Sequence, residues 1–230
     1  MTEPHPAGAK TLDSGLRILW ALREHPDGLG LAELARLLEL DRNAVRRMLG
    51  ALTRHRLVVR VEPTRYQLGL GLVELALAVQ PRLREAAAAE LRRLADAAGA
   101  TAFVTALEGD DAVVVSVVEP TRSFAHVAYR AGLRHAADRG ASGIAILAGR
   151  PPVAGERPEV TAARDRGYSM TRGELEPGTW GLAAPVTAGR LPAEASVGVV
   201  SIGELDEDRT APEVLAAAAT ISALLPAAAR

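Results

Sequence analysis

The sequence predicts an α+β protein in two parts: three short helices with a β-hairpin, then a larger part built on an antiparallel sheet. Apolar residues repeat at helical spacing three times before residue 55, and the period then changes to alternation over residues 57–69. Beyond residue 100, short strand-like runs follow one another and are interspersed with helices. Strands paired locally in this way indicate an α+β domain with an antiparallel sheet.

Composition limits the class of protein. The 230 residues suffice for two small domains, and 48% hydrophobic with 24% charged residues is ordinary for a soluble globular chain. The absence of cysteine excludes disulfides, thiolate metal sites and a cysteine nucleophile. No apolar run approaches 18 residues, and "MTEPHPAGAK" lacks the apolar core of a signal peptide. We therefore expect a soluble cytoplasmic protein without a membrane partner.

We expect four segments along the chain. Residues 1–10 have the composition of a disordered arm, 11–69 form a first domain, 70–81 a linker helix, and 82–230 a second domain. The pattern of residues 70–98 is helical but contains Pro81, which predicts two helices that meet at Gln80. Gly99 has the position of a residue that ends the second helix. The linker is apolar over most of its circumference, so another surface must cover it.

Each helix of the first domain has its own apolar stripe. The first stripe comprises Leu12, Leu16, Leu19, Trp20 and Leu22, and the second comprises Leu31, Leu34, Ala35 and Leu38. The third comprises Val45, Met48, Leu49 and Leu52, and Asp41 precedes it at the position of an N-cap. "LVVRV" and "RYQLG", joined by "EPT", then predict a β-hairpin.

The second domain is predicted to alternate between strands and helices. The expected strands are "TAFVTAL", "DAVVVSVV", "FAHVAYR", "YSM", "WGLAAPVTA" and "EASVGVVSIG". The expected helices are "ASGIAILAG" and the C-terminal "APEVLAAAATISALLPAAA".

Positive charge is concentrated in one short segment of a nearly neutral chain. Seven arginines lie between Arg42 and Arg65, where Glu62 is the single acid. Residues 1–69 contain 11 basic and 8 acidic residues, and the remainder contains 16 basic and 20 acidic residues. The two parts therefore have net charges of +3 and −4, which indicates different partners.

The exposed face of the third helix has the composition of a DNA-reading surface. Placed at helical angles, Asn43, Arg46, Arg47, Gly50 and Arg54 lie opposite the apolar stripe. Arginine and asparagine form the bidentate contacts that read guanine and adenine in the major groove. A mid-helix glycine costs roughly 1 kcal/mol against alanine, and close approach of DNA would explain it. The alternative is a solvated basic face.

We therefore predict that this segment binds double-stranded DNA. Arg46, Asn43 and Arg47 would read base edges in the major groove. The residues expected to hold the phosphate backbone are Arg42 and Arg54 of the helix and Arg60 and Arg65 of the hairpin.

At this level of detail the chain resembles the IclR family of transcriptional regulators. The resemblance begins with "KTLDSGLRILWALREHPDGLGLAELARLLELDRNAVRRMLGALTRHRLVVRVEPTRYQLG", which is similar to the family's winged helix-turn-helix. It continues through "DRGASGIAILA", "RDRGYSMTRGELEPGTWGLAAPV" and "ASVGVVSI", which occur in the family's order. The resemblance implies a GAF-like C-terminal domain that binds a small organic effector, and homodimers or tetramers. Where the family usually has Ser-Thr-Val, this chain has Asn43, Ala44 and Val45, which changes the expected operator sequence.

An anionic effector is expected at the start of the helix after "DRGASG". Gly140, Ala141 and Ser142 would present free backbone N–H groups there, and such a terminus attracts a carboxylate or phosphate. The alternative is a plain N-cap by Ser142 over a packed helix.

The resemblance adds further residues to the expected effector site. It places pocket residues at Thr171 or Arg172 and at Gly181, and an arginine at the first position would favour an anion. Trp180 and Phe124 are candidate walls of the pocket, although each fits a plain core position as well. Residues 149–164 form a shorter segment than the family usually has, which predicts a missing or reduced helix over the pocket.

Other functions are less well supported. "GASGI" lacks the spacing of a nucleophile elbow, "GLGLVE" lacks the last glycine of a dinucleotide fingerprint, and no cofactor is expected. His126 and His135 could bind a metal across strands, which we regard as a minor alternative. The main alternative is a winged-helix protein-interaction module whose effector domain has lost its ligand.

Overall fold

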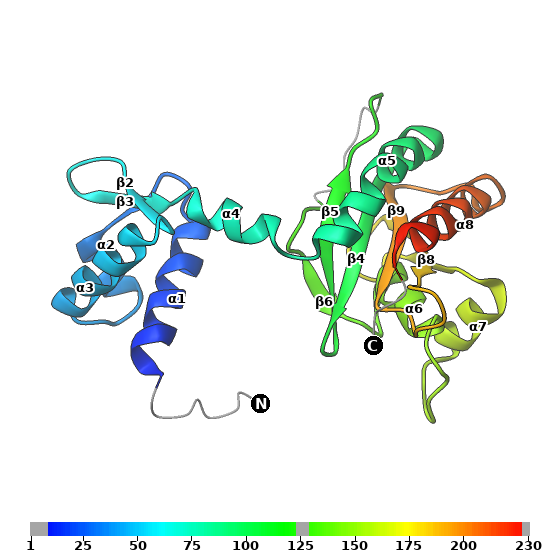
Figure 1. The fold of residues 1–230 in the computed structure, drawn as a ribbon, viewed down its shortest axis with the longest axis horizontal. Coiled ribbons are helices and arrows are strands. Elements are labelled where there is room, and N and C mark those ends of the chain that lie inside the picture. Colours follow the sequence, from blue (N-terminus) through cyan, green and yellow to red (C-terminus); the bar gives the residue numbers. More distant parts are fainter. Residues whose placement is uncertain (1–8, 123–128, 227–230) are drawn as a thin grey trace. The chain divides into compact units, whose positions relative to one another are not determined.

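The computed structural model describes residues 9–122 and 129–226. The chain divides into two compact units, Met1–Val79 and Gln80–Arg230 (Figure 1). Residues 1–8 of the expected disordered arm lie outside the described residues, and the first helix already begins at Lys10. Within the described ranges, no helix is both long enough and apolar enough to span a bilayer.

The first unit contains four helices and a small sheet in its described part. In chain order its elements are α1 (Lys10–Arg23), β1 (Leu29–Gly30), α2 (Leu31–Leu37), α3 (Arg42–Arg54), β2 (Val58–Arg60), β3 (Arg65–Leu68) and α4 (Gly71–Leu77). The sheet has the order β1-β3-β2 with antiparallel pairs throughout, so β2 and β3 form the predicted hairpin. The predicted architecture of three helices and a hairpin is thus confirmed for this unit.

The core of the first unit lies between α1, α2, α3 and the hairpin. Its centre consists of residues that are at most 1% exposed: Ile18, Leu34, Val45 and Leu49. The expected stripes of α2 and α3 face this core, whereas α1 differs from the prediction. Helix α1 buries Gly15, Ile18 and Leu22 and exposes Leu12, Leu16 and Trp20. Its apolar residues lie on two sides of the helix, and only one side faces the core.

The second unit is a six-stranded antiparallel sheet with helices on both faces. Its elements are α5 (Pro81–Ala98), β4 (Thr101–Glu108), β5 (Asp111–Val118), β6 (Arg134–Ala136), α6 (Gly140–Ala148), α7 (Pro158–Arg166), β7 (Ser169–Arg172), β8 (Thr179–Val186), β9 (Ala195–Ile202) and α8 (Glu207–Leu224). The strand order is β6-β5-β4-β9-β8-β7. The antiparallel sheet of an α+β domain is thus confirmed.

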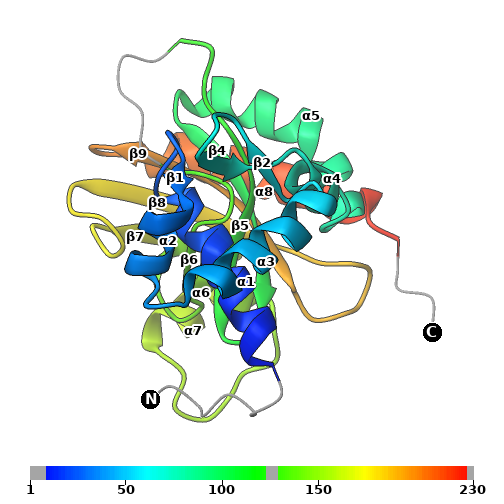
Figure 2. The ribbon, with the colours of Figure 1, turned by 90° about the vertical axis from the view of Figure 1, so that its left-hand side faces the viewer.

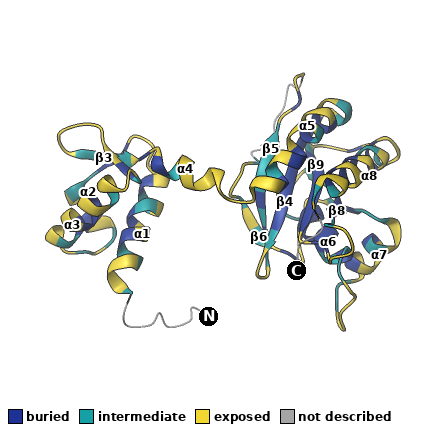
Figure 3. Ribbon diagram, in the orientation of Figure 1, coloured by how far each residue is buried: buried dark blue, intermediate teal, exposed yellow. Residues whose placement is uncertain are grey.

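The two faces of this sheet are covered differently. Helices α5 and α8 lie beside each other on one face (Figures 1 and 2), over a core that includes Leu91, Leu94, Val199 and Ile221. Helix α6 covers the other face, and α7 packs on α6. The central strands β4 and β9 are buried along most of their length (Figure 3). Side chains of one strand therefore alternate between two separate environments.

Several local predictions can be compared with the structure. Gln80 has a left-handed conformation between α4 and α5, and left-handed Gly99 ends α5 (φ +63°), as the positions of Pro81 and Gly99 predict. The strand expected at "FAHVAYR" falls mostly on residues 123–128, outside the described residues. The expectation was a missing or reduced helix within residues 149–164, and a missing helix is excluded. Helix α7 begins at Pro158 and buries Val160 and Ala163 against α6.

Candidate nucleic-acid interface and ligand cavity

Helix α3 has one buried side and one side covered with exposed polar residues. Its N-cap is Asp41, whose carboxylate Oδ1 accepts the N–H groups of Asn43 and Ala44 at 2.9 Å each. Arg42, Asn43, Arg46, Arg47 and Arg54 are all exposed, opposite the buried residues of the core. The cap fixes where the helix begins, and burial of the apolar stripe fixes which side chains face outward.

The arginines of this segment differ in whether an acid neutralises them. Within the described part of the chain, five of them have no ion-pair or side-chain hydrogen-bond partner: Arg42, Arg46, Arg47, Arg54 and Arg60. By contrast, Arg134, Arg157 and Arg164 of the second unit are each paired with glutamates. Five unneutralised guanidinium groups on one helix and one hairpin form a surface suited to a polyanion.

Gly50 lies on the same side of α3 as these arginines. A Cβ atom built on it would meet nothing within 4 Å, so the protein itself imposes no steric need for glycine there. Any reason for glycine at this position must therefore lie outside the described unit.

The structure places Arg65 differently from the other predicted phosphate contacts. Its side chain is half-buried, and the guanidinium donates hydrogen bonds to the carbonyl oxygens of Asp27 and Gly28 in the turn after α1. Arg60, on the other strand of the hairpin, is exposed. The two hairpin arginines therefore do not form one matched pair.

The second unit contains a cavity of about 510 Å³ on the α6 face of the sheet. Its apolar lining comprises Phe103, Tyr129, Leu133, Leu175, Pro177, Val200 and Ile202, and its polar lining includes Arg134, His135, Ser142, Thr171, Glu176 and Thr179. The rings of Phe103 and Tyr129 lie 4.9 Å apart at its wall. A largely apolar chamber of this size with a few polar groups fits a small organic molecule.

One wall of the cavity is polar and internally hydrogen-bonded. His135 Nδ1 lies 2.9 Å from the carbonyl oxygen of Ala136, and Nε2 lies 3.0 Å from Ser142 Oγ. Because a carbonyl only accepts, Nδ1 carries the proton in the neutral ring and Nε2 accepts from the Ser142 hydroxyl. Burial raises the pKa of the Tyr129 phenol above its usual value, and the Ser142 hydroxyl acts in the opposite direction. The wall thus presents uncharged hydroxyl groups.

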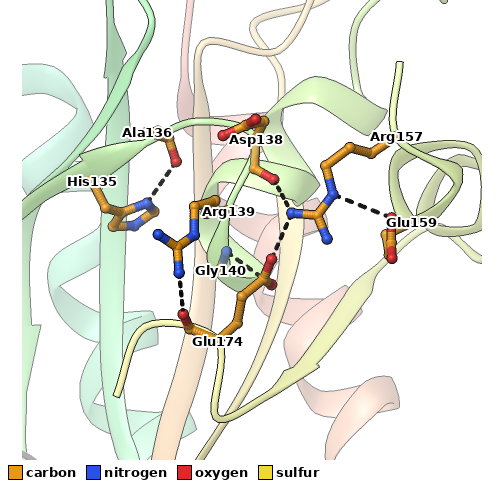
Figure 4. A network of polar contacts seen from close by, with 8 residues as sticks. All are labelled: His135, Ala136, Asp138, Arg139, Gly140, Arg157, Glu159 and Glu174. Carbon is orange, nitrogen blue, oxygen red and sulfur yellow. Dashed lines mark hydrogen bonds and ion pairs between the residues drawn. The ribbon is translucent and has the colours of Figure 1, made fainter. Parts of the chain in front are cut away.

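The N-terminus of α6 is occupied by a carboxylate of the protein itself (Figure 4). Glu174 Oε2 accepts the Gly140 N–H at 3.1 Å, and Glu174 Oε1 is paired with Arg157 at 2.6 Å. Arg139 donates to the Glu174 carbonyl oxygen, and Arg157 also donates to the carbonyl oxygen of Asp138. The anion that such a helix terminus attracts is therefore already present in the chain.

The predicted effector residues separate into two groups. Ser142 and Gly181 line the cavity, while Gly140 and Ala141 are buried beside it at the start of α6. Arg172 and Trp180 lie outside the cavity, with the guanidinium stacked 3.9 Å from the indole ring centre. Phe124 and His126 lie outside the described residues.

Strand alternation explains the separation. Thr171 pairs with Gly181 on the α6 face, whereas Arg172 pairs with Trp180 on the face covered by α5 and α8. Of the two positions expected at this point of the pocket, Thr171 therefore lines this cavity, whereas Arg172 and Trp180 do not. A shift of one residue along a strand exchanges the two faces of the sheet.

Sequence reasoning did not identify Glu174, Arg157 or Tyr129, and considered His135 only as a metal ligand. The described residues contain no group of three or more His, Asp or Glu side chains arranged to hold a metal ion. Glu174 follows the strand "YSMTR" by two residues, and only the folded hairpin brings it to α6.

Comparisons with known proteins agree with this architecture. A model of the IclR helix-turn-helix domain matches residues 11–62. The HTH-type transcriptional regulator TtgV of Pseudomonas putida is 30% identical over 145 residues, which are 63% of this chain and 56% of TtgV. The chain thus matches little more than half the length of that relative.

Solved structures match over nearly the whole chain. Pseudomonas aeruginosa HmgR is 27% identical with a TM-score of 0.78, and the match covers 94% of this chain and 99% of HmgR. An IclR homologue from Microbacterium hydrocarbonoxydans, complexed with 4-hydroxybenzoate, is 19% identical with a TM-score of 0.80, over 94% and 98% of the two chains. Residues 11–62 thus form an IclR helix-turn-helix domain, and the chain as a whole is similar to TtgV and has the fold of these solved IclR-type structures.

Proposed function

We propose that this chain is a ligand-responsive transcriptional regulator that binds double-stranded DNA through α3 and the β2–β3 hairpin. The observation that carries the proposal is the set of exposed arginines without acidic partners on α3, beside a properly capped helix start. In a helix-turn-helix, the N-terminal residues of the second helix reach the base edges. We assign base reading to Asn43, Arg46 and Arg47, and backbone contacts to Arg42, Arg54 and Arg60.

We further propose that the DNA-binding form is a homodimer or a tetramer built from it. Large apolar side chains are exposed on several elements of the first unit, among them Trp20 of α1 at 63% and Leu70 at the start of α4 at 81%. On α1, Leu12, Leu16 and Trp20 form one stripe at four-residue spacing. A second copy of the chain would cover these surfaces, and a two-fold symmetric operator would then match the two-fold symmetry of the protein.

The effector site of the proposal is the cavity beside α6. The 4-hydroxybenzoate complex of the Microbacterium homologue supports a small organic molecule as the class of ligand. An anionic effector was expected because of the N-terminus of α6 and because of Arg172. The N-terminus of α6 is occupied by Glu174, and Arg172 lies on the other face of the sheet. Arg134 lines the cavity but is paired with Glu108 and Asp111. The other polar groups that line the cavity and could orient a ligand are Ser142, His135, Thr171, Glu176, Thr179 and the phenol of Tyr129.

Ligand binding would alter DNA affinity by favouring one arrangement of the protein over another. A ligand shifts such an equilibrium only through a difference in its affinity for the two arrangements. The effector therefore has to contact residues whose positions differ between the two.

Selection of genomic fragments by the purified protein, with and without cell metabolite extract, tests the proposal. We expect enrichment of a two-fold symmetric motif and a change in enrichment when extract is added. A Ser142→Ala variant should select the same motif with a weaker response to the extract. If no motif is enriched in either condition, the DNA-binding function is wrong and the protein-interaction alternative takes its place.

A further inference from the structure

Two side chains of β3 connect the hairpin to the turn after α1 by hydrogen bonds. Arg65 Nη2 donates to the Gly28 carbonyl oxygen at 2.5 Å, and Arg65 Nε donates to that of Asp27 at 3.3 Å. Two residues along the same strand, Gln67 Nε2 donates to the Pro26 carbonyl oxygen at 2.8 Å. Three consecutive carbonyl groups of one turn are thus bonded to side chains of one strand.

The backbone around this turn is shaped to accept the strand closely. Gly28 has a left-handed conformation (φ +82°), and a Cβ atom there would lie 2.6 Å from the carbonyl oxygen of Tyr66. Beside it, Glu33 accepts the Gly30 N–H at 2.7 Å and lies 3.9 Å from Arg65 Nη1. Two of the five N–H donors of the Arg65 guanidinium are therefore directed at carbonyl groups of its own domain, and the Glu33 carboxylate lies beside its charge.

Strand geometry separates Arg65 from the arginine that is exposed on the hairpin. Arg60 lies opposite Tyr66 in the antiparallel register, so these two side chains share one face of the hairpin. Arg65 and Gln67 are the neighbours of Tyr66 on β3 and point to the other face. Arg65 and Gln67 thus lie on one face of the hairpin. Arg60 lies on the other face, which also carries the core residues Val58 and Tyr66, but Arg60 itself is exposed and has no ion-pair partner in the described chain.

We propose that Arg65 and Gln67 are positioning residues for DNA binding, which hold the hairpin at the angle that brings Arg60 to a phosphate. This inference rests on the proposed DNA-binding function and assigns Arg65 a role other than a phosphate contact. The planar guanidinium donates to two carbonyl groups at once, which a lysine ammonium cannot reproduce in the same geometry. The geometry of the side chain therefore matters for DNA affinity more than its charge.

Charge-conserving variants separate the two roles. The affinity of the full chain for a fluorescent random-sequence DNA duplex is measured over a series of salt concentrations. Each phosphate contact contributes about 0.9 to the slope of log affinity against log salt. Arg60→Ala should therefore make the slope shallower by about 0.9, and Arg60→Lys should keep the wild-type slope.

Arg65 should behave differently from Arg60. Arg65→Ala and Arg65→Lys should both lower affinity by roughly fivefold, in line with the loss of one net hydrogen bond, at an unchanged slope. Gln67→Ala removes the second fastening without a change of charge and should also weaken binding at the wild-type slope. Faster hydrogen exchange of the amides of residues 27–30 in the Arg65 variants, but not in the Arg60 variants, would report the loosened turn.

The outcomes distinguish this inference from the function on which it rests. If Arg65→Ala makes the slope shallower by about 0.9 and Arg65→Lys binds like the wild type, Arg65 is a phosphate contact and the inference is wrong. If the Arg65 variants fail to fold, Gln67→Ala decides, and wild-type affinity in that variant overturns the inference. Failure of the wild-type protein to bind any duplex would instead overturn the proposed function.

Discussion

Glu174 accepts the backbone N–H of Gly140 at the first residue of α6 and is paired, through its other carboxylate oxygen, with Arg157. The next residue, Leu175, lines the cavity and lies so close to Gly140 that a Cβ atom there would be 2.6 Å from its Cδ1. The β7–β8 loop therefore supplies both the anion at the helix terminus and part of the cavity wall. A ligand in the cavity meets Leu175 there, not an open helix terminus.

Glu174→Gln should destabilise the second unit. The amide keeps the size of the side chain but removes the charge that faces Arg157, whose side chain is 34% exposed. Loss of one partner of a partly buried charged hydrogen bond costs about 1–3 kcal/mol. Urea denaturation measures the free energy of unfolding, with Glu159→Gln as the matched control, because Glu159 pairs with the same arginine but is 55% exposed. An equal decrease in the free energy of unfolding in the two variants would show that Glu174 contributes no more than the exposed Glu159.

Arg46→Ala should weaken binding to the selected motif by about 1–3 kcal/mol and relax specificity at one base pair. The reason is that Arg46 lies in the first turns of α3, exposed and without an acidic partner in the described chain. Fluorescence anisotropy with duplexes changed at each position measures both effects. Arg92→Ala, which removes the same charge from exposed α5 in the second unit, is the control. An equal loss on every sequence would make Arg46 a backbone contact.

Gly50→Ala should raise stability and lower DNA affinity at the same time. Alanine is favoured over glycine in a helix by about 0.5–1 kcal/mol, and the structure leaves open space for its Cβ. If DNA backbone approaches α3 at this position, the added methyl group hinders the complex. Thermal denaturation and DNA titration of the same preparation separate the two effects. Wild-type DNA affinity in a stabilised variant would show that the glycine has no role in docking.

Acid should unfold the second unit partly through Glu156. The Arg164 guanidinium holds the pKa of Glu156 at about 2, below its ordinary value of 4.5. Because the folded-state pKa is the lower one, the stabilisation is fully present above pH 4.5 and is lost as pH falls toward 2. Urea denaturation at a series of pH values measures this loss. Between pH 4.5 and pH 2, the free energy of unfolding should fall less in Glu156→Gln than in the wild type. Parallel pH profiles would show that the pair does not contribute.

Local sequence signals predicted the parts of the fold that depend on neighbouring residues. Asp41 caps α3, Gln80 separates α4 from α5, and Gly99 ends α5, as their positions along the chain indicate. The buried side of α3 followed from helical spacing alone. In each case the determining contacts lie within a few residues of one another.

The features that sequence did not reveal depend on distant contacts or on strand register. Glu174 meets Gly140 across 34 residues, and Arg65 meets Gly28 across 37. The choice between Thr171 and Arg172 depended on which residue faces α6, and a strand rich in apolar and small residues does not show its inner side. Both faces of this sheet are covered, so alternation of polar and apolar residues gives no signal.

Whether α3 reads a DNA sequence can be decided from the ratio of two affinities. The purified protein is titrated against the selected motif and against a random-sequence duplex of the same length at one salt concentration. We expect the protein to bind the motif about a thousandfold more tightly or better, as in specific protein–DNA complexes. Equal affinity for the two duplexes would show that the arginines of α3 bind phosphates alone and would contradict sequence-specific regulation.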